Sequence, residues 1–180
     1  MTFLLDVNVL IALIDPTHVG HEAAHNWFGE TGASSWATCP LTENAVIRVV
    51  GYPRYPNSAG SPAAVARFVA RLRALPGHVF WEDNFSLIGS DLVNVDQIMT
   101  PGQVTDAYLL ALAVANKGQL ATFDRRLSTK AVRAAGLPST SSLPGTEGFA
   151  AASIAVSSPP PDSTAQQRNE PCCCRDLRRE

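Results

Sequence analysis

Residues 1–15 read MTFLLDVNVLIALID, and this stretch sets the class of fold. A short apolar run from Thr2 to Leu5 ends at Asp6, and a second apolar run from Asn8 to Ile14 follows almost at once. The first run suits a short buried strand and the second a short helix. A strand that ends on an acid just before a helix predicts an α/β protein, in which such acids gather at one edge of a sheet.

The same alternation of strand and helix patterns continues as far as residue 138. Further strands are predicted at 35–38, 78–81 and 119–123, and further helices at 18–30, 40–50, 62–75, 85–93, 103–116 and 128–135. Strands that alternate with helices in this way indicate an α/β sheet that is mostly parallel.

The composition of the chain changes near Pro138. Residues 139–180 are rich in Ser, Pro, Thr and Ala, and they include three consecutive prolines at 159–161 and three consecutive cysteines at 172–174. This segment shows neither the period of a strand nor that of a helix. We therefore expect one domain at residues 1–138, followed by a low-complexity and largely disordered tail at residues 139–180.

Charge and hydropathy exclude several classes of protein. Lys and Arg number 14 and Asp and Glu 16, which gives a formal net charge of -2 and no global basic field for nucleic acid. The N-terminal segment lacks basic residues and carries Asp6 inside its apolar run, unlike a signal peptide. The longest apolar run, at 107–115, is too short to span a bilayer. These features predict a cytoplasmic protein without a membrane partner.

Acidic side chains occur where a parallel sheet would bring them together. Asp6 and Asp124 follow strand patterns, and Glu43 and Asp106 lie near the predicted starts of helices. Strand ends and helix starts share one edge of such a sheet, so we expect the four carboxylates to converge on one cleft. Like charges that converge repel each other, and a divalent cation relieves that repulsion. Oxygen ligands of this kind suit Mg²⁺ or Mn²⁺, which can activate a water to attack a phosphodiester.

Four blocks of sequence carry a resemblance to a known family. They are LLDVNVLIAL (4–13), LTENAVIRVV (41–50), VTDAYLLALA (104–113) and LATFDRRL (120–127). In order, spacing and apolar context they resemble the acidic blocks of PIN-domain ribonucleases, and in particular the VapC-type toxins of toxin–antitoxin pairs. The resemblance implies a PIN-like three-layer α/β/α fold with a central, mostly parallel sheet. It also implies a Mg²⁺- or Mn²⁺-dependent endoribonuclease that forms a homodimer and is inhibited by a small VapB-type antitoxin.

The resemblance also implies roles for individual residues. Matched by position, the metal ligands and catalytic residues would be Asp6, Glu43, Asp106 and Asp124. Asn8, Thr105 and Thr122 would orient neighbouring carboxylates. The departure from the family lies at the end of the chain, because residues 136–138 offer little strand character and residues 139–180 have no counterpart.

Contacts with RNA are expected from a loop and from one arginine near the acids. Tyr52 and Arg54 lie in a Pro-bounded loop, where a Tyr ring can stack on a base and Arg54 can bind a phosphate. Arg125 directly follows Asp124 and could contact the same strand of RNA. The alternative is that the loop is an ordinary exposed connection.

Two other functions compete with the ribonuclease. A phosphatase of the haloacid dehalogenase kind also places an Asp after its first strand, but it requires a second Asp two positions later, where this chain has Asn8. A PIN scaffold that only binds a partner is the non-enzymatic alternative, and the presence of all four acids argues against it. RNA cleavage, phosphomonoester hydrolysis and metal binding without turnover would distinguish the three.

Overall fold

The computed structural model describes residues 1–133 and 150–152. The elements in chain order are β1 (Phe3–Leu5), α1 (Val7–Ile14), α2 (His21–Glu30), the 3-10 helix η1 (Gly32–Ser34), β2 (Trp36–Thr38), α3 (Pro40–Val50), α4 (Pro62–Arg73), β3 (His78–Phe80), the 3-10 helix η2 (Val95–Gln97), α5 (Gly102–Ala115), β4 (Gln119–Thr122) and β5 (Ala150–Ala152).

The strands form one sheet in the order β3-β2-β1-β4-β5. The first four strands of this order run parallel, and β5 pairs antiparallel with β4. In the register, Phe3 lies opposite both Trp36 and Gln119, and Thr38 lies opposite Phe80. The central strand β1 is therefore flanked by β2 on one side and by β4 on the other.

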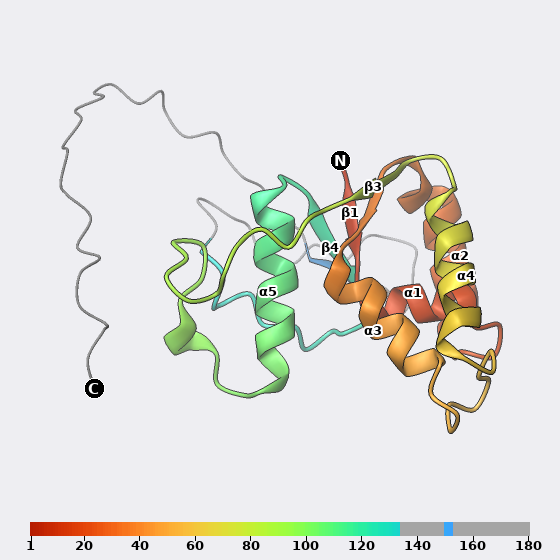
Figure 1. Ribbon diagram of the computed structural model, residues 1–180. Coiled ribbons are helices and arrows are strands. Elements are labelled where there is room, and N and C mark those ends of the chain that lie inside the picture. Colours follow the sequence, from red (N-terminus) through yellow and green to blue (C-terminus); the bar gives the residue numbers. More distant parts are fainter. Residues whose placement is uncertain (134–149, 153–180) are drawn as a thin grey trace, which may run out of the picture.

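Helices cover both faces of the sheet, with α5 on one face and α1 to α4 on the other (Figure 1). Alternate side chains of each strand point to opposite faces. Accordingly Phe3 and Leu5 pack among α1 to α4, whereas Leu4 and Leu120 pack beneath α5. Because these strands are buried on both faces, their sequences are continuous apolar runs without alternating polar residues. The predicted three-layer fold with a mostly parallel sheet is confirmed.

The helix predicted at 85–93 is wrong, because the structure has a loop there. The Ser86 hydroxyl accepts a hydrogen bond from the backbone N–H of Ile88, and the Ser90 hydroxyl accepts one from Leu92. Gly89 between them has a φ of 76°, which is left-handed. Serine side chains that bind the backbone two residues ahead compete with helix formation, and the apolar content of the segment does not overcome them.

The helix predicted at 128–135 is also wrong over its described residues, 128–133. Val132 forms an isolated antiparallel bridge with Val93. The backbone N–H of Asn94 donates to the Ala131 carbonyl at 2.7 Å, and that of Arg133 donates to the Leu92 carbonyl at 2.7 Å. The segment pairs with the loop before η2 instead of forming its own helical bonds.

Smaller differences concern where elements begin. The helix predicted from His18 starts at His21, because side chains close a turn before it. Asp15 accepts a hydrogen bond from the Thr17 backbone N–H at 2.9 Å, and the His18 ring accepts one from Gly20 at 3.0 Å. Helix α5 begins at Gly102, so Asp106 lies in its second turn.

Within the segment predicted to be a largely disordered tail, residues 150–152 form the short strand β5. Its Ala150, Ala151 and Ala152 pair with Thr122, Ala121 and Leu120 of β4. Because β4 would otherwise be an edge of the sheet, this pairing covers backbone groups beside the predicted site. The other residues of the predicted tail, and the domain boundary at 138, lie outside the described residues.

Pairing by β5 should contribute measurably to stability. A chain that ends at residue 149 should unfold a few degrees below a chain that ends at residue 156, because it leaves the outer backbone groups of β4 without a strand partner. Thermal unfolding of the two purified proteins measures the difference. Equal unfolding temperatures would show that β5 does not stabilise the sheet.

Candidate active site

At the carboxyl ends of the neighbouring strands β1 and β4, the connecting segments run to opposite sides of the sheet. From β1 the chain passes through α1 and α2 to β2 on one side, and it returns through α5 to β4 on the other side. Ligand sites of parallel α/β sheets lie at such points. Asp6 directly follows β1, and Asp124 follows β4 by two residues.

Asp6 accepts a hydrogen bond on each of its two carboxylate oxygens. It is the N-cap of α1, with φ -66° and ψ 158°, and its Oδ1 accepts from the Val7 backbone N–H at 2.7 Å. Its Oδ2 accepts from the Thr122 hydroxyl at 2.6 Å. An N-cap carboxylate binds the free N–H groups that begin a helix, so the strand–acid–helix order of the sequence itself places this side chain.

Thr122 and Asn8 connect Asp6 to the segment that carries Asp124. The Thr122 hydroxyl donates to Asp6 and accepts from Asn8 Nδ2 at 3.1 Å and from the Asp124 backbone N–H at 3.0 Å. Asn8 Oδ1 accepts from the Phe123 backbone N–H at 3.2 Å. One donor and two acceptor positions exhaust the capacity of a hydroxyl, so the orientation of Thr122 is fully determined.

Three aspartates interact electrostatically at this point. Burial raises the pKa of Asp6, and the charge of Asp124 raises it further, against hydrogen bonds from Thr122, Val7 and Asn8 that lower it. Burial likewise raises the pKa of Asp106, and the charges of Asp6 and Asp124 add to the effect. The structure thus brings together acids from the end of β1, from α5 and from the turn after β4, and their mutual repulsion favours a bound cation.

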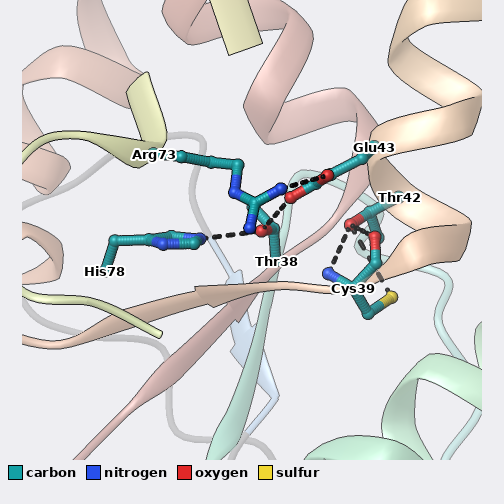
Figure 2. Close-up of polar contacts among 6 residues, drawn as sticks. All are labelled: Thr38, Cys39, Thr42, Glu43, Arg73 and His78. Carbon is teal, nitrogen blue, oxygen red and sulfur yellow. Dashed lines mark hydrogen bonds and ion pairs between the residues drawn. The ribbon is translucent and has the colours of Figure 1, made fainter. Parts of the chain in front are cut away.

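Glu43, the fourth predicted acid, is held by other partners (Figure 2). Its Oε1 accepts from the Thr38 hydroxyl at 2.5 Å, and its Oε2 pairs with Arg73 Nη1 at 3.1 Å. Thr38 in turn lies 2.8 Å from Nε2 of His78. Glu43 lies in the first turn of α3, and that helix start is fixed by a capping interaction between Cys39 and Thr42.

The chemistry of these acids suits a hard divalent cation, since every candidate ligand atom is a carboxylate oxygen. Their spacing is more open than a complete site. Over residues 1–133 and 150–152, no three His, Cys, Asp or Glu side chains are close enough together to hold a metal ion. The charge and the oxygen chemistry of the three aspartates suit a cation, although their side chains do not converge closely enough to enclose one, and Glu43 is engaged elsewhere.

The remaining predicted residues lie in three different places. Tyr52 and Arg54 line an open pocket of ≈ 430 Å³ together with Arg48 and Tyr55. Arg125 is exposed beside Asp124. Thr105 is exposed and lines a second groove.

A buried acid that the sequence analysis left out anchors the loop of the first pocket. Asp15 is 4% exposed and accepts hydrogen bonds from the Tyr55 hydroxyl at 2.6 Å and from Asn57 Nδ2 at 2.7 Å. Burial by itself would raise the pKa of Asp15, but these bonds and those from Thr17 outweigh it and lower the pKa. The acid therefore remains charged and fixes the loop that carries Tyr52 and Arg54.

Sequence reasoning also missed Thr38, Arg73 and His78. Thr38 could have been found, because it is a polar residue at the carboxyl end of a strand, the same signal that identified Asp6 and Asp124. Arg73 and His78 give no such signal. Their contacts with this edge arise from the packing of α4 beside α3 and of β3 beside β2.

Comparisons with known proteins identify the family of the chain. The model of the PIN domain family matches residues 3–132. Ribonuclease VapC44 of Mycobacterium tuberculosis is 44% identical over 135 residues, which cover 73% of this chain and 92% of the relative. Ribonuclease VapC39 of the same species is 41% identical over 131 residues, covering 73% and 94%, and Ribonuclease VapC38 is 42% identical over 128 residues, covering 71% and 89%.

The chain therefore belongs to the PIN domain family, among the VapC-type ribonucleases that these relatives represent. Within the residues that the structure describes, none of the helices has the length and apolar content that crossing a membrane requires.

Repulsion among the aspartates gives a signed prediction for stability. In EDTA, Asp106→Asn should raise the free energy of unfolding by about 1 kcal/mol at neutral pH. The folded state raises the pKa of Asp106 above 3.8, so the cost of its charge appears as the pH rises above that value. The gain should accordingly shrink as the pH falls toward 3.8.

Chemical unfolding of wild type and variant from neutral to acidic pH measures this difference. Asp96→Asn, which removes an exposed acid of η2, is the matched control and should change little. An Asp106→Asn protein that is less stable than wild type in EDTA would mean that this acid supports the fold and is not part of a repulsive cluster.

Proposed function

We propose that the protein is a Mg²⁺- or Mn²⁺-dependent endoribonuclease that acts as the toxin of a toxin–antitoxin pair. The observation that carries the proposal is the group of three mutually repelling aspartates at the divergence of β1 and β4, in a chain of the VapC-type group. An RNA phosphodiester is the substrate class, and the cytoplasm is the expected location.

Asp6, Asp106 and Asp124 would hold the cation, with Glu43 as a further ligand. When bound, such a cation lowers the pKa of a coordinated water and stabilises negative charge on a phosphate. Thr122 orients Asp6 through its 2.6 Å hydrogen bond, and Asn8 fixes Thr122. We assign these two residues the role of holding the ligands in place. Thr105 remains a predicted neighbour of Asp106, exposed at the groove side of α5.

RNA contacts are proposed at the pocket of Tyr52 and Arg54 and at Arg125. Tyr52 is 55% exposed, so its ring is available for stacking on a base. Arg48 and Arg54 line the same pocket and can bind phosphate. The anchoring of this loop by Asp15 limits the conformational entropy that binding would cost.

A PIN scaffold without activity is the second candidate. It is favoured by the pairing of Glu43 with Arg73 and by the open spacing of the acids among the described residues. The phosphatase alternative has lost its support, because the chain belongs to another family and both ends of the Asn8 amide are engaged in hydrogen bonds.

The activity can be tested on purified RNA. In Mg²⁺ the wild type should produce internal cuts, and Asp6→Asn and Asp106→Asn should each lower the rate by about 100-fold or more, since a carboxylate ligand of the cation is lost. EDTA should abolish cleavage. Asp96→Asn, at an exposed position, should cleave like the wild type. Full cleavage by Asp6→Asn would refute the site, and absence of cleavage by a folded wild type would favour the inactive scaffold.

Partners are proposed on the basis of the same group of proteins. We infer a homodimer and a small VapB-type antitoxin that neutralises it. Expression of the wild type alone should arrest bacterial growth, whereas Asp6→Asn, at equal protein level, should not. Colony counts after induction measure this. If the wild type cleaves RNA in vitro but both proteins allow equal growth, the toxin role is contradicted and the nuclease activity is not.

A further inference from the structure

Among the four acids, Glu43 is the one whose carboxylate forms an ion pair with a described residue, Arg73. The Thr38 hydroxyl donates to Oε1, and Arg73 Nη1 donates to Oε2 (Figure 2). The Glu43 side chain is only 13% exposed, whereas that of Arg73 is 41% exposed. The carboxylate is largely removed from water, and the guanidinium supplies a compensating positive charge.

The position of Glu43 is reinforced from the neighbouring strands. Because the Thr38 hydroxyl donates its proton to Glu43, the His78 Nε2 at 2.8 Å must donate to Thr38. This chain of bonds runs from β3 through β2 to α3. It keeps Oε1 directed at the sheet and leaves Oε2 as the oxygen whose partner can change.

Arg73 is also held on its other side. Its guanidinium carbon lies 4.7 Å from the centroid of the Phe80 ring, a cation–π contact at the end of β3. The last residue of α4 is thus placed over the carboxyl edge of the sheet by two contacts, one with an acid and one with a ring. Arg73 therefore occupies a defined position beside Glu43, the fourth proposed ligand.

The divalent cation and the Arg73 guanidinium therefore compete for the Glu43 carboxylate. Glu43 is a proposed ligand of the divalent cation, yet Arg73 neutralises it in the metal-free protein. The ion pair directs one oxygen of Glu43 toward α4 in the metal-free protein. A divalent cation can recruit Glu43 only if Arg73 gives up Oε2.

We propose that Arg73 is an internal counter-ion that competes with the divalent cation for Glu43. Binding of the cation releases the guanidinium at the edge of the site, and the Arg73–Glu43 ion pair weakens binding of the cation. By linkage, whatever the ion pair contributes to the metal-free protein is subtracted from the affinity for the metal. The inference rests on the proposed metal site and assigns a residue outside the four acids a role in loading it.

Mn²⁺ binding to the full chain tests this directly, with free Mn²⁺ measured by electron paramagnetic resonance and no RNA present. Arg73→Gln should bind Mn²⁺ roughly tenfold more tightly than wild type, within the usual range of coupling between two sites. Arg71→Gln is the matched control, because Arg71 lies on the same helix over the Phe68 ring and is likewise exposed. It should stay close to the wild-type affinity.

A double-mutant cycle separates competition for Glu43 from a general loss of positive charge. In the Glu43→Gln background, Arg73→Gln should no longer tighten Mn²⁺ binding. Arg73→Met, which keeps an apolar stem against Phe80, serves as the second variant if Arg73→Gln does not fold. Thermal unfolding in EDTA establishes that each protein is folded.

The outcomes distinguish this inference from the proposed function. Unchanged or weaker Mn²⁺ binding by folded Arg73 variants would overturn the competition, while loss of binding in Asp6→Asn would still support the metal site. Equal tightening by Arg71→Gln, or tightening that persists in Glu43→Gln, would also overturn it. If neither the wild type nor any Arg73 variant binds Mn²⁺, both the metal site and the competition are refuted.

Discussion

The hydrogen bond from Thr122 to Asp6 is the contact on which the rest of the site depends. It joins the carboxyl ends of β1 and β4, which lie 116 residues apart in the chain. Asp6 at the same time caps α1 through Val7, so one side chain fixes a strand end, a helix start and a carboxylate. Its hydrogen bonds lower the pKa of Asp6, yet burial prevails and the pKa is raised. The fold therefore holds a charge where that charge is unfavourable, which is the kind of site where stability is exchanged for function.

The acids at this edge are compensated in two different ways. Asp6, Asp106 and Asp124 repel each other, and no ion pair with a described residue compensates their charge. Glu43, beside β2, has its own cation in Arg73. A divalent cation that binds at this edge relieves the repulsion among the three aspartates. To bind Glu43 as well, it must displace Arg73 from the carboxylate. Under the proposed function, repulsion among the aspartates thus favours metal binding, whereas the Arg73–Glu43 ion pair opposes coordination by the fourth ligand.

The sequence predicts the parallel sheet and the acids at its edge because both follow from local order along the chain. A buried strand, an acid and a helix N-terminus are neighbours in sequence, so the amino-acid order alone places Asp6 at the edge of the sheet. The contacts of Arg73 with Glu43 and of His78 with Thr38 could not be placed in this way, since they arise from the packing of α4 beside α3 and of β3 beside β2. The helix predicted at 85–93 failed for a local reason. Two turns closed by serine side chains outweigh the apolar pattern on which the prediction rested. Strand β5 escaped prediction because alanines have no strong strand preference, and pairing with β4 supplies what their sequence lacks.

The central claim is that three aspartates form one electrostatically coupled group that binds a divalent cation. The most direct measurement is a carbon-13 NMR titration of the Asp side-chain carboxyls in the full chain, with and without Mg²⁺. Without metal, Asp6 and Asp106 should titrate above the ordinary value of 3.8, and Asp6→Asn should lower the pKa of Asp106 by removing a neighbouring charge. Saturating Mg²⁺ should lower the pKa of both residues in the wild type. Ordinary pKa values for both residues that neither Asp6→Asn nor Mg²⁺ changes would contradict the account.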